Sequence, residues 1–262
     1  MGVFQCVAAT IVLESGVGDS ARAILAIRRP AATTTVMNDS SQERLSLGRM
    51  QNPVRGFLNG AAAAASLVGT ALLWTRGAGD VSRQLALLVF GVSLLALYTV
   101  SSLYHSVPWR EPWKARMQRL DHAMIYVLVA GTYTPIAAIA LSGRYRSTVL
   151  GAVWGIALVG IAQKALLPQI AASVSITLQT VQGWLGPFMV APLARHLSWE
   201  PIALIALGGL LYTAGMVLFV TRRPRLWPHV FGYHEVFHIL VVAASLLHYL
   251  AIFTYVAPLT LP

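Results

Sequence analysis

Long apolar runs recur along this chain and constrain its fold more than any other feature of the sequence. Seven of these runs come close to the roughly 20 residues that an α-helix needs to cross the hydrocarbon core of a bilayer. The runs cover residues 57–74, 84–103, 122–141, 148–167, 171–193, 201–220 and 234–256. Their lengths and spacing predict an all-α membrane protein, a seven-transmembrane-helix bundle that occupies residues 51–262.

Composition supports a membrane protein over a water-soluble one. Hydrophobic residues make up 56% of the chain and charged residues only 11%, and a soluble domain cannot accommodate that balance on its surface. The fifth run is the least regular, because two glutamines and two prolines interrupt it. Such breaks are tolerated inside a bundle, where neighbouring helices satisfy the backbone polar groups.

Residues 1–50 differ in character from the rest of the chain. Polar and apolar residues are mixed there, Glu14 interrupts the one short apolar run, and no basic segment precedes that run. These features argue against a secretory signal peptide. We predict that residues 1–50 form either a disordered cytosolic tail or an upstream extension of a protein whose true start is Met37 or Met50.

The distribution of positive charge predicts the orientation of the bundle. The formal net charge is +10 at pH 7, but the Lys and Arg residues are spread over the loops between the apolar runs. That spread favours membrane orientation as their role, so no nucleic-acid partner is expected. The loops on the N-terminal side hold more of these residues, including segments 110–119 and 222–225. The positive-inside rule then predicts a cytoplasmic N-terminus and, for seven spans, a C-terminus outside.

Ionisable and hydroxyl side chains at the borders of the runs fall into three clusters. With the predicted topology, all three clusters lie at the same depth on the cytoplasmic side. The clusters are Ser101 with His105, Asp121 with His122, and His234 with His238. Polar groups within spans are energetically costly and usually face the bundle interior, so the alignment predicts one shared functional site.

The segment FGYHEVFHILVV contains the motif HExxH, formed by His234, Glu235 and His238, which is typical of zinc metalloproteases. Histidines one helical turn apart can reach one zinc ion, and the glutamate of such a motif acts as a general base. The remaining downstream candidate, His248, lies about 15 Å along the helix axis from His238, whereas a zinc to nitrogen bond is about 2.1 Å. We therefore expect the third ligand to come from upstream, from His105.

Three histidines and an open coordination position are typical of a catalytic zinc, which activates water and polarises a carbonyl. Zn²⁺ is the expected cofactor, and the ligand types also fit Mn or Fe. We expect Asp121 to complete the site, either as a further ligand or through a hydrogen bond to metal-bound water. Ser101 lies one helical turn before His105 and faces the same way.

Several segments resemble the haemolysin III family of bacterial membrane proteins, which is related to the progestin and adipoQ receptors and more distantly to alkaline ceramidases. The similar segments are SSLYHS, RLDHAMIYVLVAGTYTP, GGLLYTAGMVLF and FGYHEVFHILVVAASLLHY. The resemblance covers roughly residues 53–257. It implies a seven-helix fold with a zinc site near the cytoplasmic face and with membrane lipids as partners.

The resemblance also assigns roles to individual residues. The SxxxH motif of the family falls on Ser101 and His105, its helical aspartate on Asp121, and its HxxxH motif on His234 and His238. In the related receptors the aspartate contacts zinc through water and the serine lies close by, which implies the same for Asp121 and Ser101. Two positions depart from the family pattern around Asn59, because Arg55 and Ala63 stand where relatives often have an acidic residue and a histidine.

Three further residues each allow two interpretations. Glu235 is either a general base or an interfacial residue that is solvated or ion-paired, and we favour the second because relatives do not all have a glutamate there. His122 points about 100° away from Asp121 on a helix, so we expect it to orient the aspartate or to bond a neighbouring helix. His248 belongs either to a polar cavity or to an interhelical hydrogen bond.

Together these features predict a zinc-dependent hydrolase of the bacterial inner membrane that cleaves an amide or ester bond of a membrane lipid. Asp121 and Ser101 are the expected catalytic residues, with Asp121 orienting or deprotonating the water and Ser101 supporting the water or the oxyanion. The alternative is a non-enzymatic protein with a structural zinc, either a receptor-like or membrane-homeostasis protein or a cytolysin.

Overall fold

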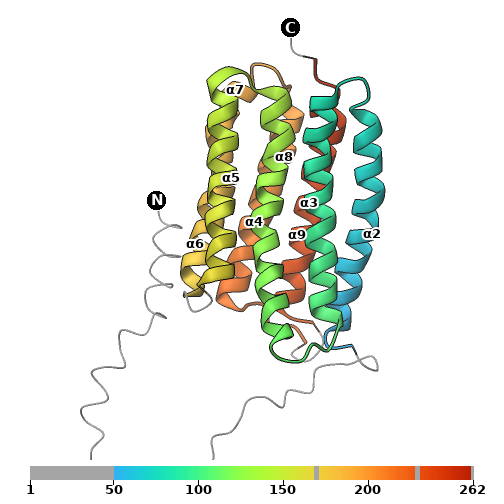
Figure 1. Ribbon diagram of the computed structural model, residues 1–262, viewed down its shortest axis with the longest axis vertical. Helices are drawn as coiled ribbons and strands as arrows, with labels where there is room; N and C mark the ends of the chain where they lie inside the picture. The colour runs from blue at the N-terminus through green and yellow to red at the C-terminus, as the bar shows by residue number, and fades with distance from the viewer. Residues whose placement is uncertain (1–49, 168–170, 228–230, 261–262) are drawn as a thin grey trace, which may run out of the picture.

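The computed structural model describes residues 50–167, 171–227 and 231–260, and these residues form a bundle of helices (Figure 1). The predicted tail, residues 1–50, lies outside the described residues except for Met50. The elements, in chain order, are α2 (Pro53–Arg76), α3 (Val81–Ser106), α4 (Trp113–Ala140), α5 (Gly143–Leu166), α6 (Ala172–Gly183), the 3-10 turn η1 (Gly186–Met189), α7 (Val190–Leu193), α8 (Trp199–Thr221), α9 (Tyr233–Ala251) and the π-helical turn η2 (Ile252–Val256).

Six helices in the described part of the chain are long and apolar enough to cross a membrane. They are α2, α3, α4, α5, α8, and α9 together with η2. An all-α, multi-pass membrane protein is therefore confirmed, whereas the predicted count of seven spans is not. The predicted fifth span is divided among α6, η1 and α7, and the 12 residues of α6 extend only about 18 Å at 1.5 Å per residue. The orientation of the termini stays a prediction, because it depends on that count.

The segment formed by α6, η1 and α7 is held in the bundle by side chains that form hydrogen bonds with its backbone. Tyr133 of α4 donates a hydrogen bond of 2.7 Å to the Gly183 carbonyl, where α6 ends, and Tyr126 donates one of 3.0 Å to the Ser175 carbonyl. In return the fully buried Gln182 amide donates to the carbonyls of Tyr126 and Val153. A helix can end inside an apolar bundle only where such partners replace water, which explains why this segment carries glutamines.

The start of α4 differs from the prediction. The apolar run begins at His122, but the helix begins at Trp113, so Asp121 lies two turns inside the helix rather than at its first residue. Lys114, Arg116 and Arg119 make these first turns too polar to be recognised as a membrane span. Lysine and arginine nevertheless have high helix propensity, and they suit the water-facing end of a bundle.

The helices from α2 to α6 each pack against the next one, α8 packs against α9, and α2 and α9 also contact each other. Figure 1 shows that α3 ends, and α4 and α9 begin, at the same end of the bundle. Apolar side chains fill the interior along α3 and α4, among them Leu87, Phe90 and Tyr126, which are fully buried. The three predicted polar clusters therefore meet at one end of a packed apolar core.

Candidate metal centre

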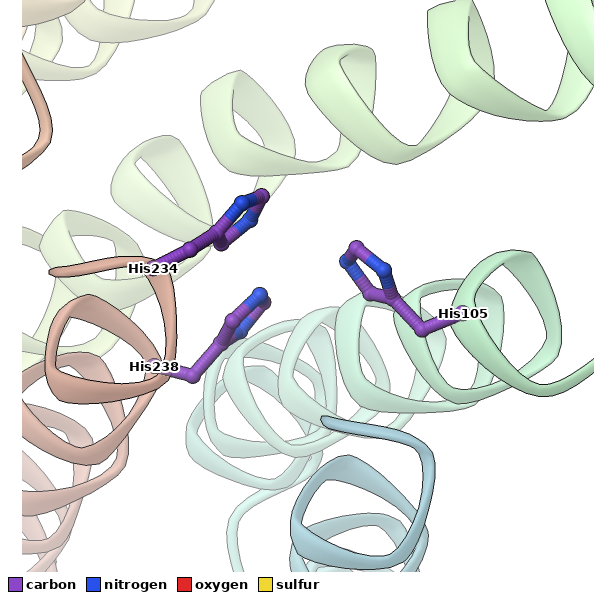
Figure 2. A group of neighbouring side chains, drawn as sticks. All are labelled: His105, His234 and His238. Carbon is purple, nitrogen blue, oxygen red and sulfur yellow. The ribbon is translucent and has the colours of Figure 1, made fainter. Parts of the chain in front are cut away.

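Three histidines from two helices face one another at this end of the bundle (Figure 2). Each offers one ring nitrogen, and these three atoms all lie within 4.8 Å of one another. The ring of His105 lies 5.3 Å from that of His234 and 5.0 Å from that of His238, measured between centroids. Within the described residues, no other group of three or more His, Cys, Asp or Glu side chains is placed to hold a metal ion.

The local structure of each helix orients these rings. His234 and His238 lie four residues apart on α9, so their rings stack at 5.0 Å with only 5° between their planes. His105 lies in the last turn of α3 and is 3% exposed. It meets the two α9 rings nearly at right angles. One ring nitrogen from each histidine thus lies close enough to the other two for the three to share one metal ion.

The two ring nitrogens of His238 have different surroundings. The Nδ1 atom of His238 lies 3.3 Å from the side-chain nitrogen of Asn59 on α2. The Nε2 atom of the same ring is buried and has no hydrogen-bond partner among the described residues. The Asn59 amide nitrogen can only donate, so Nδ1 accepts this contact and Nε2 carries the ring hydrogen in this arrangement. A ligating imidazole donates its other N–H, so metal binding at Nε2 requires the hydrogen on Nδ1 instead.

Ser101 of α3 and Asp121 of α4 lie next to each other in the bundle. Both side chains are buried, and the Ser101 hydroxyl interacts with the Asp121 carboxylate. Ser101 lies one turn before His105 on α3. Asp121 is not among the residues whose ligand atoms come within reach of the three imidazoles. This arrangement favours the interpretation of Asp121 as a group that acts through water over its interpretation as a ligand.

Glu235 forms an ion pair rather than facing the three rings. Its Oε1 atom lies 2.6 Å from Nε of Arg55, and the two side chains are 8% and 14% exposed, respectively. Its Oε2 atom accepts a 2.8 Å hydrogen bond from the Gly232 backbone N–H and so caps the start of α9. The structure thus shows the ion-paired interpretation of Glu235, and it accounts for Arg55 as the partner of that carboxylate.

His122 and His248, the two other histidines of the predicted membrane spans, are not part of the group of three rings. His122 is partly buried on α4, and its backbone carbonyl accepts a 3.4 Å hydrogen bond from Gln179 of α6. His248 lies deeper in the bundle, where its Nε2 atom is 3.0 Å from the Ile205 carbonyl of α8. The interhelical hydrogen bond expected as one interpretation of His248 is therefore present, and neither histidine belongs to the group of three.

Comparisons with known proteins agree with the segments that carry the site. The model of the family described as "Haemolysin-III related" matches residues 49–249. Hemolysin-3 of Bacillus cereus is 33% identical over 180 residues, which cover 69% of this chain and 79% of that protein. The Hemolysin-3 homolog of Bacillus subtilis (strain 168) is 36% identical over 157 residues, which cover 60% and 70%, respectively.

A more distant similarity extends to animal proteins. The human protein named Monocyte to macrophage differentiation factor is 25% identical over 197 residues, which cover 72% of this chain and 78% of that protein. The family model spans more than half of this chain and includes all three histidines, Ser101 and Asp121. On this basis the chain belongs to the haemolysin III-related family of membrane proteins.

Proposed function

We propose that this protein binds zinc through His105, His234 and His238 and hydrolyses an amide or ester bond of a lipid in the bacterial inner membrane. The observation that carries the proposal is the convergence of three largely buried imidazoles within 4.8 Å of one another. Three histidine ligands leave one position of a tetrahedral ion open, which is the arrangement of catalytic rather than structural zinc sites.

Each of the polar residues around the histidines has its own role in the proposed reaction. Zinc in such a site supplies a Lewis acid that activates water and polarises a carbonyl. The Asp121 carboxylate holds a water molecule by accepting its hydrogen bond, and it takes the proton on a carboxylate oxygen when that water attacks. Ser101 holds the Asp121 carboxylate in place through the interaction between the two side chains. Asn59 contacts Nδ1 of His238 and so helps to fix the orientation of that ring.

The surroundings of His234 support a lipid as the substrate. The ring of Phe219 on α8 lies 5.2 Å from the His234 ring and perpendicular to it, and Phe237 and Tyr233 lie 6.2 Å away on α9. These aromatic rings give one side of the site an apolar wall, which suits acyl chains better than peptides or sugars.

The proposed reaction is tested by metal-dependent turnover. Purified protein is reconstituted with a total bacterial lipid extract, either loaded with zinc or treated with a chelator, and the lipids are analysed by mass spectrometry. We expect free fatty acid and its matching amine or alcohol to accumulate only in the zinc-loaded sample. Equal product in both samples, or no product from any lipid class with zinc bound, would contradict the hydrolase.

A second candidate function follows from the name of a relative. The Bacillus cereus protein is called Hemolysin-3, so a protein that perturbs membranes without cleaving lipid is the competing proposal. In that case zinc stabilises the α3–α9 junction, and its removal lowers the thermal stability while no lipid product appears at any zinc concentration. The turnover experiment therefore separates the two candidates directly.

A further inference from the structure

A strongly basic segment joins α3 to α4 at the end of the bundle where α9 begins (Figure 1). We call residues 109–120 the basic segment, and they comprise the end of the loop after α3 and the first two turns of α4. The segment contains four basic side chains and one acidic side chain, which are Arg110, Lys114, Arg116, Arg119 and Glu111. None of these five residues belongs to the candidate metal centre.

Hydrogen bonds define the shape of the basic segment. The Trp109 indole N–H donates a 3.0 Å hydrogen bond to the Leu103 carbonyl, close to the end of α3. The Lys114 backbone N–H donates one of 3.1 Å to the Arg110 carbonyl, so the loop passes directly into the first turn of α4. The basic side chains are therefore presented from a hydrogen-bonded turn and a helix, which fixes where their charges lie relative to the bundle.

One face of the basic segment places a cation between exposed apolar side chains. Trp113, Arg116 and Leu120 are separated by three and four residues, so they share one face of α4. Trp113 is 55% exposed and Leu120 is 42% exposed, and the Arg116 guanidinium lies over the Trp113 ring, 4.8 Å from its centroid. This combination suits the boundary between the headgroups and the acyl chains of a bilayer, where apolar side chains are covered and a guanidinium stays among polar groups.

The positive charge of the basic segment is not balanced by acidic side chains in the part of the chain that the structure describes. Arg110, Lys114 and Arg116 are exposed, and none of them forms an ion pair there. The first turn of α4 also has no acidic residue and no side-chain cap. Lys114 and Arg116 thus lie at the end of a helix dipole that favours negative charge. An anion bound at this place offsets both the side-chain charges and the dipole.

We propose that the basic segment binds the phosphate of an anionic phospholipid, with Lys114 and Arg116 at the phosphate and with Trp113 and Leu120 against the acyl chains. Arginine can hold two phosphate oxygens at once, and it can do so while it is stacked on an aromatic ring. A phospholipid fits this surface better than free phosphate does, because only the lipid also covers the exposed indole and leucine. The binding surface requires neither zinc nor lipid hydrolysis.

The experiment measures lipid binding to the full-length protein in detergent by native mass spectrometry. Phosphatidylglycerol is the probe, and phosphatidylcholine with the same acyl chains is the control without net charge. Inorganic phosphate serves as a competitor, which separates recognition of the lipid from recognition of its phosphate alone. We expect phosphatidylglycerol to stay bound at concentrations at which phosphatidylcholine does not, and we expect an equal concentration of inorganic phosphate not to displace it.

Two charge-matched double variants test the location of the surface. Lys114→Gln with Arg116→Gln should weaken phosphatidylglycerol binding about 30-fold, since each basic side chain near an anionic headgroup contributes about fivefold. Arg144→Gln with Arg195→Gln removes the same charge at the other end of the bundle and should keep the wild-type affinity. All four residues are exposed, and circular dichroism checks that both variants fold. Equal binding of the two lipids, equal losses in the two variants, or displacement by inorganic phosphate would overturn the proposal.

Discussion

Replacing His234 and His238 together with alanine is expected to abolish stoichiometric zinc binding. Each of these imidazoles offers a ring nitrogen to the group of three, and Nε2 of His238 has no partner among the described residues. Loss of a residue that merely orients a ligand typically costs 10- to 100-fold in metal affinity, so each lost ligand should cost at least about 100-fold. Elemental analysis of purified protein and a competition titration with a zinc chelator measure the stoichiometry and the affinity.

The matched control is His196→Ala, because His196 is exposed in the segment between α7 and α8. That variant should keep one zinc per protein and wild-type affinity. Thermal unfolding in detergent shows whether the double variant is still folded. One equivalent of tightly bound zinc in the folded double variant would contradict this site, because the zinc would then be bound by other residues.

The second large effect concerns the ion pair between Arg55 and Glu235. The Glu235→Gln substitution keeps the cap of α9, because glutamine also fits that position, but it leaves the charge of Arg55 uncompensated in a largely buried place. Breaking a buried pair in this way costs about 3 kcal/mol, the lower end of the usual range. We also expect zinc binding to weaken about tenfold, since the Arg55 charge acts on both His234 and His238.

The double variant Arg55→Gln and Glu235→Gln separates charge balance from catalysis. With both charges removed, zinc affinity should return close to the wild-type value, and most of the lost stability should be recovered. Lipid hydrolysis should then return together with zinc binding. A metalloprotease-type mechanism with Glu235 as the base predicts instead that both variants are inactive even when zinc is bound, so a zinc-loaded but inactive double variant would restore that interpretation.

Parts of this structure could be predicted from the sequence because they depend on local spacing. Apolar runs locate the six long helices, and a separation of four residues places His234 and His238 on one face of α9. The sequence also places His105 with these two residues, because the end of α3 and the start of α9 lie at the same depth in the membrane. The weakness of the fifth run, with its glutamines and prolines, indicates the place where the helix breaks.

Other features could not be predicted, because they depend on how distant helices pack. Arg55 pairs with Glu235 across 180 residues, and Asn59 meets His238 across 179 residues. Neither spacing carries a sequence signal, and both contacts arise only when α2 lies against α9. The position of Asp121 outside the group of three imidazoles is of the same kind, since it depends on the register of α3 against α4.

The Asp121→Asn variant provides the most direct test of a zinc-dependent lipid hydrolase. Asparagine keeps the size of the side chain and can still bond Ser101, but it cannot take a proton from water, and proton transfer of this kind typically contributes about 100- to 10,000-fold to a rate. The measurement combines the zinc content of the wild type and the variant with mass spectrometry of lipids before and after incubation. We predict zinc in both proteins and lipid product from the wild type alone. Zinc in both proteins with no lipid product from either would contradict hydrolysis and leave zinc a structural role.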